Sequence, residues 1–334
     1  MRHTLRDPMP DRPFRLQRSE LAVPATSERF FAKAASGPAD FVFLDLEDAV
    51  SPDRKDMARR NAAAALNDID WGDKTLALRI NDLGTPWAIR DIVDVVSASE
   101  RLDLVLLPKA GSAFDVQFVA QLLTGLEREH GRTKRIGIEV LIETARGLAH
   151  VEEIAASSDR LEGMIFGVGD YSVEMRTFET RFGEPNPAYA VLSHGEGTRT
   201  RHWNDHWHFA QARIANACRA YGLRPIDGPY ANYGDLEGYR NSCERAAALG
   251  FEGKWAIHPS QVAVANDVFS PSPAQVRMAQ EVEAALDRSV REGAGAVGHG
   301  GVLVDMAHAK LADALLGRHR AVRARDGAAE EPVS

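Results

Sequence analysis

The stretch Ile-Gly-Ile-Glu-Val-Leu-Ile-Glu at residues 136–143 decides the fold class of this chain. It is a short, apolar, β-branched run that ends in an acid, as is typical of a buried strand. A second run of the same kind, Met-Ile-Phe-Gly-Val-Gly-Asp at residues 164–170, follows after a segment of helical length. The two runs predict parallel strands that deliver Glu143 and Asp170 to the same edge of a sheet.

Apolar runs of strand length recur along the chain, and helix-length segments separate them. The runs lie at Glu20–Val23, Phe41–Leu46, Leu76–Ile80, Leu104–Leu107, Ile136–Ile142, Met164–Val168, Leu223–Ile226 and Trp255–Ile257. Helical periodicity is present at Asp53–Leu66, Pro86–Ser97, Ala113–Leu126 and Thr144–Ala156. Eight strands alternating with helices predict an α/β fold, a (β/α)8 TIM barrel. An open doubly wound sheet is the competing fold, but no GxGxxG or P-loop pattern follows Leu46 or Ile80.

The part of the chain after the last predicted strand has a different pattern. Pro271–Arg291 and Val304–Arg318 predict two helices, and the glycine-rich stretch Gly293–Gly301 predicts the link between them. Polar residues follow to the end of the chain. We therefore expect a catalytic barrel over residues 1–270, a C-terminal helical appendage over residues 271–318 and a flexible tail over residues 319–334.

Residues 179–206 interrupt the alternation of strands and helices. They are rich in Gly, Pro, Asn, Arg and His, which predicts a long loop over the mouth of the barrel. His202, His206 and His208 lie at the end of this segment, and His202 and His206 would share a helix face. No further ligand pattern supports a zinc site, so we expect these histidines to pack or to face solvent.

Composition limits the classes of function. The chain has 334 residues, 44% hydrophobic and 26% charged, enough for a large core. A formal net charge of -8 without a dense basic stripe argues against nucleic acid as the main partner. No segment approaches the about 20 apolar residues of a membrane span. Cys218 and Cys243 have no disulfide or zinc spacing and residues 1–15 lack a signal-peptide pattern, so we expect a cytoplasmic protein.

Glu143 and Asp170 indicate chemistry at the carboxyl ends of the strands, which form the working face of such a barrel. Two carboxylates there are hard oxygen ligands, and Mg²⁺ typically takes only one or two of them together with substrate and water. The alternative is that each acid caps the helix after its strand. Two acids in matching positions favour a divalent-cation site.

Six ordered segments together resemble one known family, the malyl-CoA lyase branch of the citrate lyase β-subunit superfamily. They are Arg18–Pro24, Phe43–Ala49, Leu141–Ala145, Phe166–Asp170, Arg224–Pro229 and Gly253–Gln261. The resemblance runs from about Arg15 to about Leu315. It implies a Mg²⁺- or Mn²⁺-dependent barrel that acts on 3-hydroxyacyl-CoA thioesters, as a homo-oligomer, trimer or hexamer, with shared active sites.

The activity that this resemblance implies is the reversible cleavage of (S)-malyl-CoA to acetyl-CoA and glyoxylate. β-Methylmalyl-CoA, cleaved to propionyl-CoA and glyoxylate, is a second expected substrate. Two alternatives remain: a (S)-malyl-CoA thioesterase built on the same site, and a citrate lyase β-like subunit that acts on an acyl-carrier thioester. Gly169 stands where Ala is frequent in the family, and the following residues 171–176 are bulkier and more charged. The preferred acyl group, acetyl or propionyl, therefore stays open.

The resemblance also assigns roles to residues at the barrel mouth. It implies that Glu143 and Asp170 bind the metal ion, and that Arg79 holds the substrate carboxylate, for which its guanidinium fork is suited. Glu47 and Asp48 are expected to orient waters around the metal. An ion pair between Arg79 and either of these acids is the alternative, and both roles can coexist.

Strand geometry limits how the acids of this segment can face one site. Side chains alternate along a strand, so Asp45 and Glu47 share one face and Asp48 lies on the other. All three acids can face the same cation only if the chain bends. Lys109, at the end of the run Leu104–Leu107, is a further basic group at the mouth, and pairing with a barrel carboxylate is at least as well supported as a substrate contact.

Contacts to coenzyme A are implied by the resemblance alone. Arg18 and Lys33 are assigned to its charged end, and the backbone at Ala256 and Ile257 to its pantetheine arm. Gly169, beside Asp170, is expected to line the same substrate site.

Asp305 is the remaining candidate. A lone Asp before an apolar helix is usually an N-cap. In the family, however, the matching acid of the C-terminal appendage reaches the active site of a neighbouring subunit and serves as acid or base at the α-carbon of the acyl-CoA. The resemblance therefore implies that Asp305 is catalytic.

Overall fold

A computed structural model describes residues 12–178, 181–193, 197–291 and 295–327 of the chain. The chain divides into two compact units, Met1–Asn266 and Asp267–Ser334. The boundary between them lies close to the one expected after residue 270. Among the described residues, none of the helices combines the length and apolar character needed to cross a membrane.

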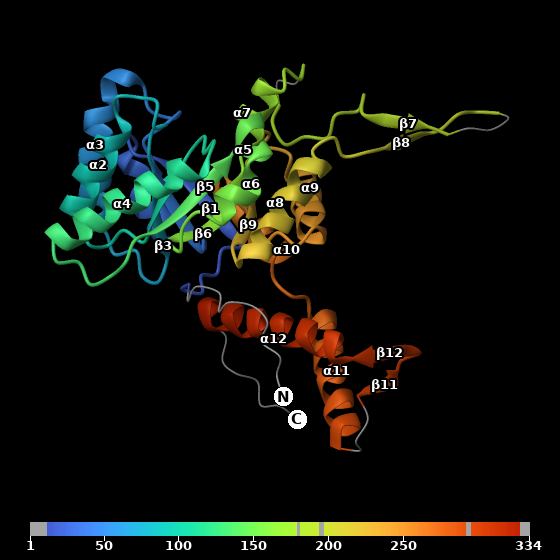
Figure 1. The fold of residues 1–334 in the computed structure, drawn as a ribbon. Helices are drawn as coiled ribbons and strands as arrows, with labels where there is room; N and C mark the ends of the chain where they lie inside the picture. Colours follow the sequence, from blue (N-terminus) through green and yellow to red (C-terminus); the bar gives the residue numbers. More distant parts are fainter. Residues whose placement is uncertain (1–11, 179–180, 194–196, 292–294, 328–334) are drawn as a thin grey trace. The chain divides into compact units, whose positions relative to one another are not determined.

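The first unit contains a closed barrel of parallel strands (Figure 1) in the order β1-β10-β9-β6-β5-β4-β3-β2. These strands are β1 (Ser19–Pro24), β2 (Phe41–Asp45), β3 (Thr75–Arg79), β4 (Leu104–Leu107), β5 (Gly137–Ile142), β6 (Leu161–Phe166), β9 (Arg224–Asp227) and β10 (Gly253–Ala256). Each matches an expected strand, so the predicted TIM barrel is confirmed. The strand expected to end at Val168 ends at Phe166 instead, because Val168 already begins a helix.

Helices cover the outside of the barrel (Figure 1). They are α1 (Phe31–Ser36), α2 (Lys55–Asp68), α3 (Ala88–Ala98), α4 (Ala113–Glu129), α5 (Ala145–Ala149), α6 (Val151–Ala155), α7 (Val168–Glu174), α8 (His208–Tyr221), α9 (Leu236–Ala248) and α10 (Pro259–Val268), with short 3-10 turns η1 (Glu28–Phe30) and η2 (Pro52–Arg54). In α3, Ile92, Val95 and Val96 are buried, as the helical period of apolar residues requires. The helix expected over Thr144–Ala156 is two short helices, because His150 leaves helical geometry between them.

The long segment at 179–206 contains a short antiparallel hairpin that the sequence did not indicate. Its strands are β7 (Ala190–Leu192) and β8 (Arg201–Trp203). Val191 is 60% exposed and no residue of β7 is buried, so β7 has no buried apolar face that would produce a recognisable alternation. Residues 179–180 and 194–196 of the expected loop lie outside the described residues.

The second unit pairs two helices, α11 (Pro273–Arg291) and α12 (Met306–Asp326), as expected. Their apolar contact consists of Val276, Ala279, Ala312 and Leu316, with Val282 and Leu315 packed against it. The expected glycine-rich link forms a hairpin of β11 (Ala296–His299) and β12 (Val302–Asp305), and Gly300 and Gly301 supply the positive φ of its turn. Residues 292–294 lie outside the described residues.

The expectation of a flexible tail from residue 319 is wrong for residues 319–326. Helix α12 continues to Asp326 and ends at Gly327, which adopts the left-handed conformation that closes many helices. The start of this helix also differs from the expected Val304, because Val302–Asp305 pair as a strand. Residues 328–334 of the expected tail lie outside the described residues.

Side chains from alternate strand positions fill the barrel interior. They form a buried apolar cluster of Phe41, Phe43, Ala77, Leu104, Leu106, Leu141, Ile165, Ile226 and Trp255. The same alternation continues past the cluster in both directions along the strands. Toward the carboxyl ends it reaches Asp45, Arg79 and Glu143, each two positions beyond a cluster residue, so these polar groups also point inward.

Toward the amino ends, the interior contains a buried polar network. Gln17 Nε2 donates to Glu20 Oε1 and to Glu139 Oε1, both at 2.8 Å. Arg224 Nη2 lies 3.3 Å from Glu139 and 3.0 Å from Glu162. Burial raises the pKa of both Glu20 and Glu139 above the ordinary value. Arg224 therefore supplies the positive charge that this buried layer needs.

We expect Arg224→Met to lower the free energy of unfolding by about 3–5 kcal/mol, because it leaves buried carboxylates without their cation. Arg219→Met is the matched control, since Arg219 pairs with Glu252 with half of its side chain exposed, and such pairs contribute about 0–1 kcal/mol. Chemical denaturation of both variants measures the difference. Equal losses would contradict the importance of the buried layer.

Candidate functional site

The candidate site lies at the carboxyl ends of β2 to β6, where inward-pointing polar residues gather. Asp45 is the last residue of β2, Arg79 is the last residue of β3, and Glu143 directly follows β5. All three side chains are buried. Buried charges need partners, and the contacts among these residues organise the mouth of the barrel.

Arg79 forms a bidentate ion pair with Asp45. Its Nε lies 2.7 Å from Asp45 Oδ1, and its Nη2 lies 2.6 Å from Asp45 Oδ2. The remaining nitrogen, Nη1, lies 3.0 Å from Glu47 and 3.9 Å from Asp48. Burial opposes its charge, but Asp45 and Glu47 more than compensate and raise the pKa of Arg79. The expected pairing with Glu47 is present, while Asp45 is the main partner.

A bend after β2 brings Glu47 and Asp48 to the same site. The strand ends at Asp45, whose Oδ1 accepts the backbone N–H of Glu47 at 2.9 Å. Lys55, at the start of α2, then donates its Nζ to the carbonyls of Leu46 and Glu47, each at 2.7 Å. The bend that strand alternation required is therefore present. Lys55 was not among the predicted site residues, because nothing in the sequence of a helix indicates that its first lysine donates hydrogen bonds to carbonyls of the preceding loop.

Three acids come close enough to share a cation. Glu47, Asp48 and Asp170 each offer one oxygen within 4.8 Å of the others. Asp170 lies in the first turn of α7 rather than at a strand end. Glu47 Oε2 and Asp170 Oδ2 have charged neighbours, Arg79 Nη1 at 3.0 Å and Lys109 Nζ at 2.8 Å. A set of three carboxylates in which every ligand atom is oxygen fits a hard divalent cation such as Mg²⁺ or Mn²⁺.

Glu143 borders this group without belonging to it. Its Oε1 accepts the backbone N–H of Lys109 at 2.8 Å. Its side chain packs on Gly167, where a Cβ would come within 2.4 Å of it. Burial, together with the nearby charge of Glu47, raises the pKa of Glu143 to about 8. The predicted metal ligands, Glu143 and Asp170, lie close enough for their charges to interact, since Asp170 contributes to the raised pKa of Glu143. Glu47 and Asp48, which were expected only to orient waters, each have an oxygen within 4.8 Å of one from Asp170.

Lys109 pairs with the acids of the mouth. Its Nζ lies 2.5 Å from Glu47 Oε1 and 2.8 Å from Asp170 Oδ2. The pairing that the sequence left open for this residue is therefore present. Lys109 follows β4, which lies between β3 and β5 in the barrel order.

Arg18 does not reach this face, which corrects its assignment to coenzyme A. It precedes β1 and so lies at the amino ends of the strands, with only 2% of its surface exposed. Its Nε and Nη2 lie 2.8 and 2.9 Å from the two oxygens of Asp40. The resemblance of the Arg18–Pro24 segment to the family assigned Arg18 to coenzyme A, but its guanidinium group forms a buried ion pair with Asp40.

The other residues assigned to coenzyme A follow barrel strands at the carboxyl ends. Lys33 is exposed on α1, the helix after β1. Ala256 ends β10, the neighbour of β1, and the exposed Ile257 follows with its N–H bonded to Gln261 at 2.8 Å. Gly169 lies in α7 beside Asp170, and a Cβ there would meet the Phe182 ring at 3.5 Å.

Asp305 is the N-cap of α12 in the second unit. Its Oδ1 accepts the backbone N–H of Ala307 at 2.9 Å and lies 2.8 Å from His308 Nδ1. These hydrogen bonds, that of His308 first, lower the pKa of Asp305. The carboxylate is exposed, so the capping role expected of an isolated Asp is present and leaves the second oxygen accessible.

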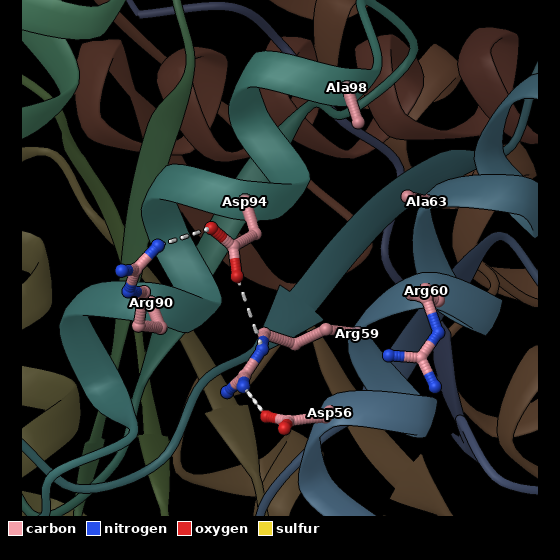
Figure 2. Close-up of a pocket in the computed structure, with 7 residues that line it drawn as sticks. All are labelled: Asp56, Arg59, Arg60, Ala63, Arg90, Asp94 and Ala98. Atoms are coloured by element: carbon pink, nitrogen blue, oxygen red, sulfur yellow. Dashed lines mark hydrogen bonds and ion pairs between the residues drawn. The ribbon is translucent and has the colours of Figure 1, made fainter.

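A cavity of about 640 Å³ lies elsewhere, between α2 and α3 (Figure 2). It is lined by Asp56, Arg59, Arg60, Ala63, Arg90, Asp94 and Ala98. Arg59 pairs with Asp56 and, at 3.4 Å, with Asp94, which also lies 3.5 Å from Arg90. None of the strand-end residues lines this cavity, and its charges largely pair with one another.

The chain is similar to known proteins over most of its length. The sequence model of the HpcH/HpaI aldolase/citrate lyase family matches residues 18–259. The chain is 47% identical over 308 residues to an L-malyl-CoA/β-methylmalyl-CoA lyase of Rhodobacter capsulatus, covering 92% of this chain and 96% of that protein. It is 34% identical over 307 residues to a (3S)-malyl-CoA thioesterase of Cereibacter sphaeroides, with coverage of 92% and 96%.

A solved structure also resembles the chain over most of its length. It is the crystal structure of CitE from Mycobacterium tuberculosis in complex with magnesium, acetoacetate and coenzyme A. The two share 28% sequence identity with a TM-score of 0.69, covering 91% of this chain and 98% of that one.

The raised pKa of Glu143 predicts a pH dependence of stability in metal-free buffer. A carboxyl whose pKa rises from 4.5 to about 8 on folding binds its proton more tightly in the folded state. Its stabilising contribution is therefore complete at low pH and is lost as the pH rises through that window. We expect the free energy of unfolding of Glu143→Gln to fall less between these pH values than that of the unmodified protein. Urea denaturation across the range measures this, and parallel pH profiles would contradict it.

Proposed function

The chain belongs to the HpcH/HpaI aldolase/citrate lyase family, and we propose that it is a metal-dependent carbon–carbon lyase that reversibly cleaves (S)-malyl-CoA to acetyl-CoA and glyoxylate. β-Methylmalyl-CoA, which gives propionyl-CoA and glyoxylate, is a second substrate. The observation that carries the proposal is the convergence of Glu47, Asp48 and Asp170 beside Arg79 and Glu143 at the barrel mouth.

Negative charge develops at two places on the substrate during the reaction, the C3 oxygen and the thioester. A proton leaves the C3 hydroxyl, which becomes the carbonyl of glyoxylate. The C2–C3 bond breaks, and its electron pair forms the enolate of the acetyl thioester, which a proton then converts to acetyl-CoA. Groups that stabilise the developing negative charge and hold the carboxylate next to the breaking bond therefore accelerate it.

Glu143 and Asp170 would hold the Mg²⁺ or Mn²⁺ ion, with Glu47 and Asp48 orienting the groups around it. When bound, such an ion supplies Lewis-acid stabilisation of charge on the substrate oxygens and a template for their orientation. The carboxylate oxygens of Glu47, Asp48 and Asp170, which lie within 4.8 Å of one another, support a cation at this place. In the unloaded site, burial keeps the pKa of Glu143 raised, so this carboxyl must lose its proton to serve as a ligand.

Arg79 would bind the carboxylate of the substrate through its Nη1 edge. Asp45 occupies the other two donor nitrogens and fixes the guanidinium plane. The rings of Phe43 and Trp255 lie 5.9 and 5.4 Å from the guanidinium carbon, which restricts its movement further. A cation held in one orientation loses little entropy when an anion binds.

Coenzyme A would lie across β1 and β10, which are neighbours in the barrel. Lys33 provides a positive charge on α1 for the charged end of the ligand, and the backbone at Ala256 and Ile257 lies where the pantetheine arm would pass. Gly169 leaves room beside Asp170 for the thioester. Arg18 has no part in this binding site, since it is buried at the other end of the barrel.

Asp305 would act as acid or base at the α-carbon in the active site of a neighbouring subunit. Its lowered pKa keeps it ionised at neutral pH, the form that a base requires. This role makes the enzyme a homo-oligomer, a trimer or hexamer with shared active sites, in which residues 271–318 form the appendage that reaches the neighbour. A cytoplasmic location is part of the same proposal.

A thioesterase that hydrolyses (3S)-malyl-CoA is the second candidate, because a relative at 34% identity bears that name. The higher identity of 47% to a lyase favours cleavage of the carbon bond. A citrate lyase β-like subunit acting on an acyl-carrier thioester is a weaker alternative. Product analysis separates the first two, since only the lyase releases glyoxylate and only the thioesterase releases free malate.

Replacing the acids tests the proposal directly. We expect Glu143→Ala and Asp170→Ala to lower glyoxylate formation from (S)-malyl-CoA by at least about 100-fold, as loss of charge stabilisation at a reacting oxygen does. EDTA should abolish turnover of the unmodified enzyme, and Mg²⁺ should restore it. Glu153→Ala, a change of an exposed acid on α6, is the control that should keep full activity. Sustained turnover in EDTA would refute the metal-dependent lyase.

Mixing two inactive variants tests the shared active site. Asp305→Asn and Glu143→Gln should each be inactive, because each removes one half of every site. In co-expressed mixed oligomers, sites that combine an intact Glu143 with an intact Asp305 of the neighbour should form, and a random one-to-one mixture makes about one quarter of all sites intact. Glyoxylate assays on purified hybrids measure the recovery. Hybrids without activity would show that both residues act within one chain or that Asp305 is not required at the site.

A further inference from the structure

Lys109 contacts three of the four acids around the candidate cation site, and the proposed function gives it no task. Its Nζ lies 2.5 Å from Glu47 Oε1 and 2.8 Å from Asp170 Oδ2. Its backbone N–H donates to Glu143 Oε1 at 2.8 Å. A single residue therefore links three acids that come from three different strands or their following turns.

The backbone of Lys109 is unusual in a way that serves these contacts. Its φ of 50° lies in the left-handed region, which residues with a side chain rarely adopt. Such a conformation costs free energy and persists where the surroundings fix it, most often at functional sites. In this conformation the N–H of Lys109 bonds to Glu143, while the side chain reaches Glu47 and Asp170.

Charge balance at the mouth depends on this lysine. Arg79 has two of its three nitrogens engaged by Asp45 and shares only Nη1 with Glu47. The ammonium of Lys109 is the cation that contacts Asp170 among the described residues. A lysine ammonium is charged at neutral pH, and here it lies within hydrogen-bonding distance of both Glu47 and Asp170.

We propose that Lys109 is a positioning residue of the acid site, and that its ammonium competes with the divalent cation for Asp170. In the unloaded protein it neutralises the repulsion between Glu47 and Asp170 and keeps both oxygens directed toward the site. This inference rests on the proposed function, because it takes Asp170 as a ligand of the cation.

The competition follows from simple electrostatics. Asp170 Oδ2 faces Nζ at 2.8 Å, and two cations at one carboxylate oxygen repel each other strongly where water is partly excluded. Binding of the divalent cation to Asp170 must therefore offset the loss or weakening of the contact between Lys109 and Asp170. As a result the acids stay ordered without the cation, and the cation is bound less tightly than the number of carboxylates alone suggests.

Binding of Mn²⁺ to metal-free enzyme, without substrate, tests the competition. The electron paramagnetic resonance signal of free Mn²⁺ reports the dissociation constant. We expect Lys109→Met to bind Mn²⁺ about tenfold more tightly, the ratio equivalent to one charge-assisted hydrogen bond that no longer has to be displaced. Lys109→Arg keeps the charge and should keep weaker binding. Unchanged or weaker binding by Lys109→Met would overturn the competition.

Thermal unfolding of the same proteins tests the positioning role. Lys109→Met should unfold at a lower temperature than the unmodified protein in EDTA, because repelling acids lose their cation, and Mn²⁺ should remove this difference. Lys134→Met is the matched control, since Lys134 pairs with the buried Asp103 away from the mouth. Its loss of stability should be the same with and without Mn²⁺. A loss for Lys109→Met that Mn²⁺ does not change would show a merely structural role.

These measurements are independent of the reaction that the enzyme catalyses. Neither uses a thioester, so they report on Lys109 even if the unmodified enzyme releases no glyoxylate from malyl-CoA. A failure to release glyoxylate would overturn the proposed function. The positioning role of Lys109 would still be decided by the metal-binding and unfolding measurements.

Discussion

The ion pair between Arg79 and Asp45 is the interaction on which the mouth of the barrel depends. Asp45 and Arg79 occupy the last, inward-facing positions of two neighbouring strands, so closure of the barrel brings their side chains together. The pair fixes the guanidinium plane, and Asp45 also accepts the backbone N–H that turns the chain toward Glu47. Without it, neither the arginine nor the acids after β2 would have a defined orientation. Lys55 completes the turn from outside the barrel by holding its carbonyl groups.

The two ends of the barrel interior group their buried charges differently. At the amino ends, Glu139 and Glu162 share Arg224, and Gln17 donates to Glu139. At the carboxyl ends, Arg79 and Lys109 pair with Glu47, and Lys109 also pairs with Asp170. Among the described residues, the mouth is where three carboxylate oxygens lie within 4.8 Å of one another. This end is therefore the one suited to a divalent cation, whereas the amino-end layer supports the fold.

Asp305 shows how one residue can fit two explanations. As an N-cap it accepts hydrogen bonds from the first amides of α12, and its side chain remains exposed. The helices of the second unit pack on each other through a small apolar contact of their own. A cap at the start of a helix is a rigid place from which to present an acid, so the structural role and the proposed catalytic role are compatible.

The barrel could be predicted from the order of residues, because its buried parallel strands are continuous apolar runs separated by segments of helical length. Glu143, Asp170, Arg79, Glu47 and Asp48 could be placed at the mouth in the same way, since each ends or closely follows such a run. Which of these groups meet is known only from the folded chain. The burial of Arg18 with Asp40 and the reach of Lys109 to Glu47 and Asp170 depend on contacts between residues far apart in the chain, whereas the nearby Lys55 holds the bend after β2. Local patterns specify the direction and length of strands, whereas the pairing of charges is set by distances that exist only once the barrel has closed.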